Sequence, residues 1–226
     1  MIPDNFFLGI TTTENETGLA LIRKDEILYQ HCETFEDNHG TSLHNETIFY
    51  LIKSAFDKVG ITARDLSGIG VVLGPGKFTS LRVGLACAKG LALPYEIKIK
   101  GFNTLEALAF SVREVISIPQ PIIVPIVDIK RGEVYYQIYQ GTHVMSEPKI
   151  IPADKISEIF PERSILVGSG VARYRDLVTK STQLSYTIFD THYPSPRAVA
   201  KYARKAILLG QYDELTNLTP IYLRPV

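Results

Sequence analysis

The sequence has few of the residues that mark specialised classes of protein. Its 226 residues include no tryptophan, two methionines and two cysteines, Cys32 and Cys87. The cysteines have no metal-binding or redox spacing, so we expect both to be buried and reduced, as in a cytoplasmic protein. No apolar run reaches the roughly 18 residues of a membrane helix, and the N-terminus lacks the pattern of a signal peptide.

Net charge is also absent, because 24 lysines and arginines balance 24 aspartates and glutamates. A broad electrostatic surface for nucleic acid is therefore not expected, although a local basic patch is left open. With 45% hydrophobic and 21% charged residues, the composition is that of an ordinary globular protein. The length allows one large domain or two small lobes.

The stretch Gly74–Ala92 carries the most information. The apolar run Ile69–Leu73 predicts a buried strand, Gly74-Pro75-Gly76 predicts a tight turn, and a helix capped by Thr79 or Ser80 follows. The stretch is neither a Walker A loop nor a dinucleotide-binding fingerprint, because the glycines and hydroxyls that these motifs require are replaced by Val71, Phe78 and Thr79. What remains is a loop with backbone N–H groups at a helix N-terminus, a generic anion site.

The helix that starts near Thr79 is apolar on more sides than a sheet requires. Arg82 and Lys89 are its only charged residues, and they share one narrow stripe with Ala86. Gly84 and Gly90 each cost about 1 kcal/mol relative to alanine inside a helix. We therefore expect a second body, from this chain or another, to approach the helix closely.

The preceding helix, which Thr41 or Ser42 would cap and Gly60 would end, has the same property. Phe49 and Phe56 lie seven residues apart and widen its apolar stripe beyond one sheet face.

The order of the predicted elements occurs twice, on either side of the proline-containing segment 117–121. Each half reads as three strands followed by alternating helices and strands. The expected strands are Phe6–Thr12, Thr17–Arg23, Glu26–Glu33, Ile69–Leu73 and Glu96–Lys100, then Ile122–Asp128, Glu133–Gln140, Val144–Ile151, Ser164–Val167 and Tyr186–Phe189. The expected helices cover 41–60, 79–92, 104–115, 152–159, the segment from Ala172, and 195–210. This order predicts an α/β protein of two ribonuclease-H-like lobes, 1–117 and 118–226, the architecture of the actin, hexokinase and sugar-kinase superfamily.

Several motifs resemble those of the bacterial TsaB proteins, also called YeaZ. The run from Gly74 to Ala86 resembles the family pattern G-P-G-S-F-T-G-L-R-I-G-L-A. The segment from Asp128 to Tyr135 resembles D-A-R-R-G-E-V-Y, and His44-Asn45-Glu46 resembles an H-x-E helix start. Tyr193-Pro194 and the C-terminal Pro220–Arg224 also match, so the resemblance spans nearly the whole chain.

The resemblance implies a non-catalytic scaffold subunit. TsaB pairs with the catalytic subunit TsaD, and with the ATPase TsaE they transfer threonylcarbamoyl to an adenosine beside the tRNA anticodon. It implies no intrinsic cofactor, with ATP or ADP bound, if at all, at an interface with partner subunits. We also expect a weak homodimer when the chain is alone, no membrane association and a cytoplasmic location.

Pairing in this family uses the two N-terminal-lobe helices, here about His44–Val59 and Thr79–Ala92, whether the partner is TsaD or a second copy. The implied contact residues are His44, Ile48, Phe49, Leu51, Ile52, Phe56, Thr79, Arg82, Val83, Leu85, Ala86 and Lys89. A charge introduced at Leu85 is accordingly expected to break the pairing.

Loss of chemistry is indicated by the residues at the former catalytic positions. A relic nucleotide site would comprise Thr11, Thr12, Gly74, Gly76, Asp128 and Arg131. Hydroxyls replace the acidic residue that kinase-like members carry after the first strand, and hydroxyls are poor general bases and weak Mg²⁺ ligands. The TsaD metal site uses two histidines four residues apart, whereas here Ile48 follows His44 at that spacing, so we expect a capping or interface role for His44.

Asp128 has two interpretations. It is a relic phosphate or metal position, or it is a turn residue paired with Lys130 and Arg131, which we favour. An alternative places Arg131 against tRNA or a nucleotide. Gly168-Ser169-Gly170 is expected to form a tight turn.

Two other functions remain as alternatives. One is an ATP-dependent phosphotransferase or ATPase of the same fold, and the other is a metal-dependent peptidase, for which the sequence has no zinc motif.

Overall fold

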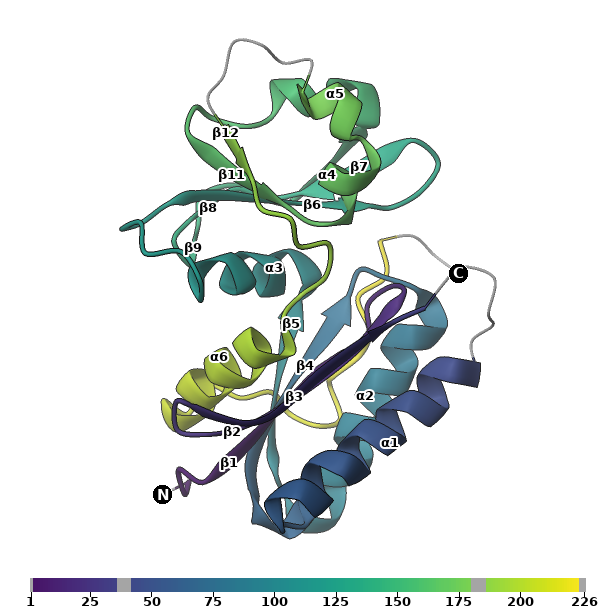
Figure 1. The fold of residues 1–226 in the computed structure, drawn as a ribbon, viewed down its shortest axis with the longest axis vertical. Coiled ribbons are helices and arrows are strands. Elements are labelled where there is room, and N and C mark those ends of the chain that lie inside the picture. The colour runs from purple at the N-terminus through teal and green to yellow at the C-terminus, as the bar shows by residue number, and fades with distance from the viewer. Residues whose placement is uncertain (1, 36–41, 180–185, 224–226) are drawn as a thin grey trace. The chain divides into compact units, whose positions relative to one another are not determined.

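The structure is a computed structural model that describes residues 2–35, 42–179 and 186–223, without the side chains of residues 42–46. It contains two compact units, Met1–Thr104 with Ser195–Val226, and Leu105–Pro194 (Figure 1). The predicted turn at 37–40, the cap at Thr41, the side chain of His44 and the C-terminal Arg224 lie outside the described residues.

The first unit is built on a five-stranded sheet with the strand order β3-β2-β1-β4-β5. Its strands are β1 (Phe6–Thr11), β2 (Glu16–Arg23), β3 (Glu26–Thr34), β4 (Leu66–Gly74) and β5 (Lys98–Asn103). The first three form an antiparallel meander, and β4 and β5 add to it in parallel through helical crossovers. This is the ribonuclease-H-like arrangement that the sequence predicted.

Two helices cover one face of this sheet, α1 (Ser42–Val59) and α2 (Phe78–Ala92) (Figure 1). Short 3₁₀ turns, η1 (Ala63–Asp65) and η2 (Leu93–Tyr95), follow them. The core beneath them comes from alternate positions of the strands and one stripe of each helix, because side chains alternate between faces along a strand. Its fully buried members include Leu8, Ile10, Leu19, Leu21, Ile48, Leu51, Ala55 and Ala88.

The other face of the same sheet is covered by α6 (Pro196–Leu208). A Cβ atom on Gly9 of β1 would lie 2.1 Å from the carbonyl oxygen of Pro196, so glycine lets the helix backbone touch the strand. Arg204 of α6 also donates two hydrogen bonds of 2.6 Å to the carboxylate of Asp4, which lowers the pKa of Asp4. The last helix in the sequence therefore belongs to the first unit.

The second unit repeats the strand order of the first, β10-β7-β6-β11-β12. Its strands are β6 (Ile122–Asp128), β7 (Glu133–Tyr136), β10 (Lys149–Pro152), β11 (Ser164–Val167) and β12 (Tyr186–Ile188), with a two-stranded extension of β8 (Tyr139–Gln140) and β9 (His143–Val144) beside β6. Its helical segments are α3 (Thr104–Arg113), η3 (Ala153–Glu158), α4 (Ser169–Arg173) and α5 (Arg175–Thr179).

The boundaries of the two units differ from the division expected at residue 117. Helix α3 packs in the second unit from Leu105 onward, where Leu108 lies against Gly168. Helix α6 packs on the first sheet, as described above. The order of elements along the chain cannot show that α3 belongs to the second unit and α6 to the first. That assignment depends on which sheet each helix covers in the folded protein.

Several local expectations for the second unit were wrong. The two long strands expected over 133–140 and 144–151 are interrupted, since Gln137 donates to the carbonyl of Ser146 and Ser146 accepts from the Ile138 N–H in place of a regular ladder. The helix expected over 152–159 is a 3₁₀ helix, and the helix expected from Ala172 is the short pair α4 and α5.

Two expectations for the first unit were also wrong. Helix α2 begins earlier than expected, with Lys77 at the N-cap position and no side-chain cap. Thr79 and Ser80 therefore lie inside its first turn. Cys87 is buried, as expected, but Cys32 is exposed because it lies on β3 at the edge of the sheet.

Candidate functional site

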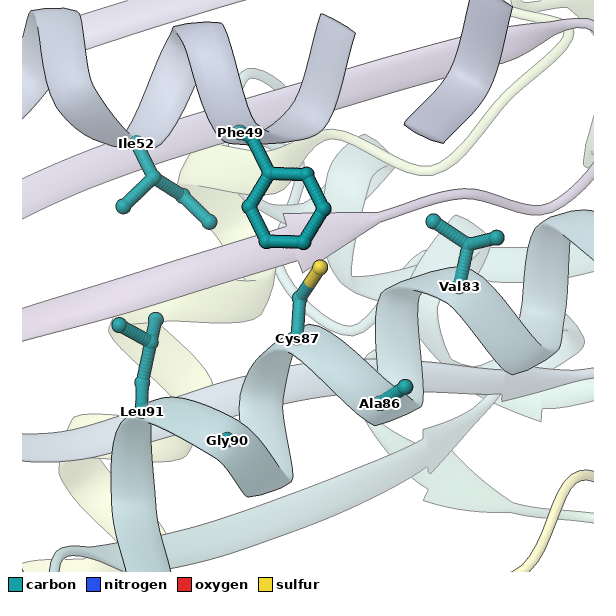
Figure 2. A pocket seen from close by; sticks show the side chains of 7 residues that line it. All are labelled: Phe49, Ile52, Val83, Ala86, Cys87, Gly90 and Leu91. Carbon is teal, nitrogen blue, oxygen red and sulfur yellow. The ribbon is translucent and has the colours of Figure 1, made fainter. Parts of the chain in front are cut away.

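An apolar groove of about 470 Å³ opens between α1 and α2. In Figure 2, Phe49 and Ile52 project from α1 toward Cys87 and Leu91 of α2, with Val83, Ala86 and Gly90 completing the lining. Phe49 is 63% exposed although it is among the largest apolar side chains of the protein. A hollow lined by apolar and small residues is a typical protein-binding surface.

The two glycines of α2 have different surroundings. A Cβ atom on Gly84 would lie 2.1 Å from the Thr12 hydroxyl, so this glycine permits close packing within the unit. A Cβ atom on Gly90 would meet no described atom within 4 Å. The intramolecular fold thus explains Gly84, whereas at Gly90 the described residues leave the groove open.

The expected pairing residues whose side chains are described divide into four groups. Ile48, Leu51 and Leu85 are buried in the core of the first unit and offer almost no surface. Phe56, Val83, Thr79 and Lys89 are half-buried, and Phe49, Arg82 and Ala86 are exposed. Ile52 is 7% exposed and lines the groove floor, together with Cys87, Gly90 and Leu91, which the sequence reasoning did not include.

Arg82 is held by the C-terminal segment of the chain. Its guanidinium lies 3.7 Å from the centre of the Phe78 ring, and its Nε donates a 2.9 Å hydrogen bond to the hydroxyl of Tyr222. The rings of Phe78 and Tyr222 stack with centres 5.1 Å apart, and the Ile221 N–H bonds to the carbonyl of Leu73. The C-terminal motif therefore packs beside the start of α2.

The loop Gly74–Lys77 packs against the end of β1. The Lys77 N–H donates to the carbonyl of Thr13 at 2.5 Å, and a Cβ atom on Gly76 would lie 2.1 Å from the same oxygen. Thr11 and Thr12 are buried, and their hydroxyl oxygens accept or donate no hydrogen bond within the described residues. The structure thus brings four of the six relic positions into one unit, at the end of β1 and the start of α2.

The other two relic positions, Asp128 and Arg131, lie in the second unit. The Asp128 side chain is 2% exposed and is paired with Lys130 Nζ at 3.0 Å and Arg173 Nε at 3.4 Å. Pairing with Lys130 confirms part of the turn interpretation, but the second cation is Arg173 and not Arg131. Sequence spacing could not identify Arg173, because it lies 45 residues further along the chain.

The tight turn expected at Gly168-Ser169-Gly170 was wrong, because Gly168 is the N-cap of α4 and Ser169 and Gly170 are its first two residues, beside Asp128. Gly168 has a φ of +109°, and a Cβ atom there would lie 2.5 Å from the carbonyl oxygen of Ile126. The backbone N–H of Asp128 donates to the Ser169 hydroxyl at 3.2 Å. Both contacts hold the start of α4 against the end of β6.

These donors do not match a Mg²⁺–nucleotide site. Mg²⁺ prefers carboxylate oxygens with room for several waters. Here β1 ends at Thr11 and is followed by Thr12 and Thr13, and Asp128 is already neutralised by two cations. Within the described ranges, no three histidine, cysteine, aspartate or glutamate side chains cluster as metal ligands. We therefore assign no chemical step to a bound nucleotide or metal.

Glu16 is an unusual residue that the sequence did not reveal. It begins β2, and burial raises the pKa of its carboxyl group to about 7. Although Cys32 as a residue is exposed, its Sγ atom points toward Gly18 of β2, and loss of water around this sulfur together with the nearby Glu16 raises the pKa of the thiol to about 12. No ion pair or hydrogen bond to the Glu16 side chain occurs in the described part of the chain.

Among the described residues, no helix is both long and apolar enough to cross a bilayer.

Comparison with known proteins agrees with this architecture. Residues 39–159 match the family model "TsaD: tRNA N6-adenosine threonylcarbamoyltransferase". The structure is similar to YeaZ from Pseudomonas aeruginosa, with a TM-score of 0.81 at 19% identity over 97% of this chain and 100% of that one. It is more distantly similar to an inorganic polyphosphate/ATP-glucomannokinase from Arthrobacter, with a TM-score of 0.51 at 11% identity over 91% and 99% of the two chains. These likenesses confirm the α/β fold of two duplicated ribonuclease-H-like lobes.

One relative is close enough in sequence to establish the family. The tRNA threonylcarbamoyladenosine biosynthesis protein TsaB of Bacillus subtilis is 30% identical over 96% of this chain and 93% of its own length. The expected resemblance is therefore confirmed, and the chain belongs to the TsaB family.

Proposed function

We infer that this protein is a scaffold subunit in the biosynthesis of threonylcarbamoyladenosine in tRNA, and that it binds TsaD through the groove between α1 and α2. The observation that carries this proposal is the groove itself, apolar and open at Phe49 and Gly90. The names of its relatives support the pathway, and the match to the TsaD family model supports a partner of the same fold.

A scaffold role also fits the former catalytic positions. Thr11, Thr12 and Thr13 supply no carboxylate at the end of β1, and the Asp128 carboxylate is occupied by Lys130 and Arg173. A phosphotransferase needs groups that hold metal and orient the attacking oxygen. In this proposal the chain binds the other subunits, and TsaD carries out the chemistry.

The remaining partners follow from the same proposal. TsaE and tRNA meet the chain within the complex, in the cytoplasm, and any ATP or ADP binds at an interface with them. When TsaD is absent, the groove is free to bind a second copy of the chain, which gives a weak homodimer because exposed apolar surfaces self-associate.

The test is titration of the purified chain with its cognate TsaD by calorimetry, with ATP hydrolysis by the isolated chain followed in parallel. One-to-one binding without turnover is expected. The opposite result would be no binding to TsaD, together with Mg²⁺-dependent ATP hydrolysis that Asp128→Ala lowers. That result would replace the scaffold proposal by the phosphotransferase alternative.

Gly90→Ala is expected to raise stability and lower affinity. Alanine favours the helix by about 1 kcal/mol relative to glycine, and no described atom obstructs the new methyl group. The same methyl group narrows the groove, so TsaD binding should weaken. Urea unfolding and calorimetry measure the two effects. Gly84→Ala is the control, because its methyl group would clash with Thr12 and lower the stability. Unchanged affinity in Gly90→Ala would place the TsaD contact elsewhere.

A further inference from the structure

The second unit carries cationic side chains on the loop that follows β6 and on the short helices α4 and α5 that follow β11. These two strands are parallel, so their carboxyl ends lie at the same edge of the sheet. The loop after β6 contributes Lys130 and Arg131, and the segment after β11 contributes Arg173 and Arg175. In a chain with no net charge, four exposed cations on these two adjacent segments form a local positive surface.

The buried carboxylate of Asp128 joins these two segments. One oxygen, Oδ2, is contacted by both Lys130 Nζ and Arg173 Nε. The other oxygen, Oδ1, accepts from the Lys130 N–H at 3.0 Å and from the Tyr174 hydroxyl at 3.4 Å. The side chains of Lys130 and Arg173 are nevertheless 65% and 59% exposed. Asp128 thus holds the charged nitrogens Lys130 Nζ and Arg173 Nε near one point, while much of each side chain still faces solvent.

The loop backbone holds Lys130 and Arg131 in a costly conformation. Their φ angles are +67° and +57°, and Gly132 follows at +72°. For residues other than glycine, this left-handed conformation costs roughly 1–2 kcal/mol each. Arg131 is exposed, and its side chain has no ion pair with a described residue. Backbone hydrogen bonds close the turn, from the Glu133 N–H to the Lys130 carbonyl at 3.1 Å and from the Ala153 N–H to the Gly132 carbonyl at 2.8 Å. They hold the Arg131 backbone in place and leave its guanidinium exposed to a partner.

The residues around these four cations favour a ligand that has both negative charge and aromatic groups. Tyr174 lies between Arg173 and Arg175, with the Arg173 guanidinium 5.8 Å from the centre of its ring. The adjoining η3 and α5 carry the exposed acids Asp154, Glu158 and Asp176, and η3 also carries the exposed Lys155, so five exposed cations face three exposed acids. The buried Asp128 carboxylate reduces this surplus of two positive charges to one. Arginine beside tyrosine is a combination that binds phosphates and stacks on bases.

We propose that Lys130, Arg131, Arg173 and Arg175 form a contact surface for the phosphodiester backbone of RNA. In the proposed function this RNA is the tRNA presented to the complex, so the inference rests on that function for the identity of the RNA. The surface lies in the second unit, whereas the groove proposed for TsaD lies in the first. The chain therefore binds the tRNA substrate of TsaD through a surface of its own.

The test is the salt dependence of binding to a fluorescein-labelled tRNA transcript, measured by anisotropy for the chain alone and mixed with TsaD. Arg131→Gln should lower the slope of log K against log salt by about 1, because one phosphate contact is lost. Raising the salt from about 50 to 200 mM then weakens tRNA binding by a factor about fourfold smaller in Arg131→Gln than in the unchanged protein. Arg131→Gln/Arg175→Gln should lower the slope by about 2.

Arg163→Gln is the matched control. Arg163 is also an exposed arginine with a left-handed φ of +58°, but it precedes β11 at the opposite end of that strand. An unchanged slope in Arg131→Gln, an equal change in Arg163→Gln, or no tRNA binding by either sample overturns the proposal. Full displacement of tRNA by excess ATP overturns it also, in favour of a free nucleotide. If TsaD fails to bind the chain, the proposed function fails, while the slope of the chain alone still decides whether this surface binds RNA.

Discussion

Replacing Phe49 by glutamate should weaken the binding of TsaD by about 100-fold or more. Phe49 is the large exposed side chain of the groove, and aromatic anchors of this kind contribute about 2–4 kcal/mol to association. Glutamate removes the anchor and also places a charge that must lose its water against apolar groups. Calorimetric titration with TsaD measures the loss, and circular dichroism checks that the fold is kept.

Tyr50→Glu is the control for this variant. Tyr50 is the next residue of α1, is 67% exposed, and does not line the groove. Both variants place the same charge on the same exposed helix, so only position relative to the groove differs. Equal affinity loss in the two, or none in Phe49→Glu, would contradict the assignment of the groove to TsaD.

Leu85→Glu, which the sequence alone suggested for the same purpose, is a poor probe. Leu85 is 5% exposed and packs in the core of the first unit with Leu8 and Ala88. A charge there should cost several kcal/mol of folding free energy, because a buried unpaired charge is strongly unfavourable. Loss of binding would then follow from loss of the fold and say nothing of the surface.

This difference shows what the apolar pattern of α2 could predict. The pattern indicated correctly that α2 meets more than its own sheet, because apolar residues surround most of the helix. It could not tell which apolar residue faces the sheet and which faces the groove, since both faces need similar side chains. The three-dimensional packing separates Leu85, which is buried, from Ala86, which is exposed.

The fold was predictable to the extent that contacts are local. The meander β1–β3 and the crossover to β4 follow from alternation and turn residues in the sequence. The placement of α6 on the first sheet depends on Gly9 and Gly70, which let the helix approach the strands closely. In the sequence alone, neither glycine indicates which helix it contacts. The contact between Arg82 and Tyr222 joins residues 140 apart and leaves no periodic pattern.

Glu16→Gln should stabilise the protein strongly in alkaline buffer and much less in acid. Burial raises the pKa of Glu16 from 4.5 to about 7, so the folded state holds a proton that the unfolded state releases. Below the unfolded pKa both states are protonated and the group has no effect. As the pH rises through this window stability falls, because the unfolded state binds fewer protons. The full penalty, about 3 kcal/mol, is reached above the folded pKa.

Glutamine resembles the protonated carboxyl group and cannot ionise, so it removes this penalty. Urea unfolding should therefore show a gain of about 1 kcal/mol at pH 5 and about 3 kcal/mol at pH 8. Glu33→Gln, on exposed β3, is the control and should show no such difference. A gain of equal size at both pH values would mean that glutamine acts through packing, and no gain at pH 8 would mean that Glu16 ionises in the folded protein without cost. The predicted rise between the two pH values is specific to a carboxyl group that folding keeps protonated.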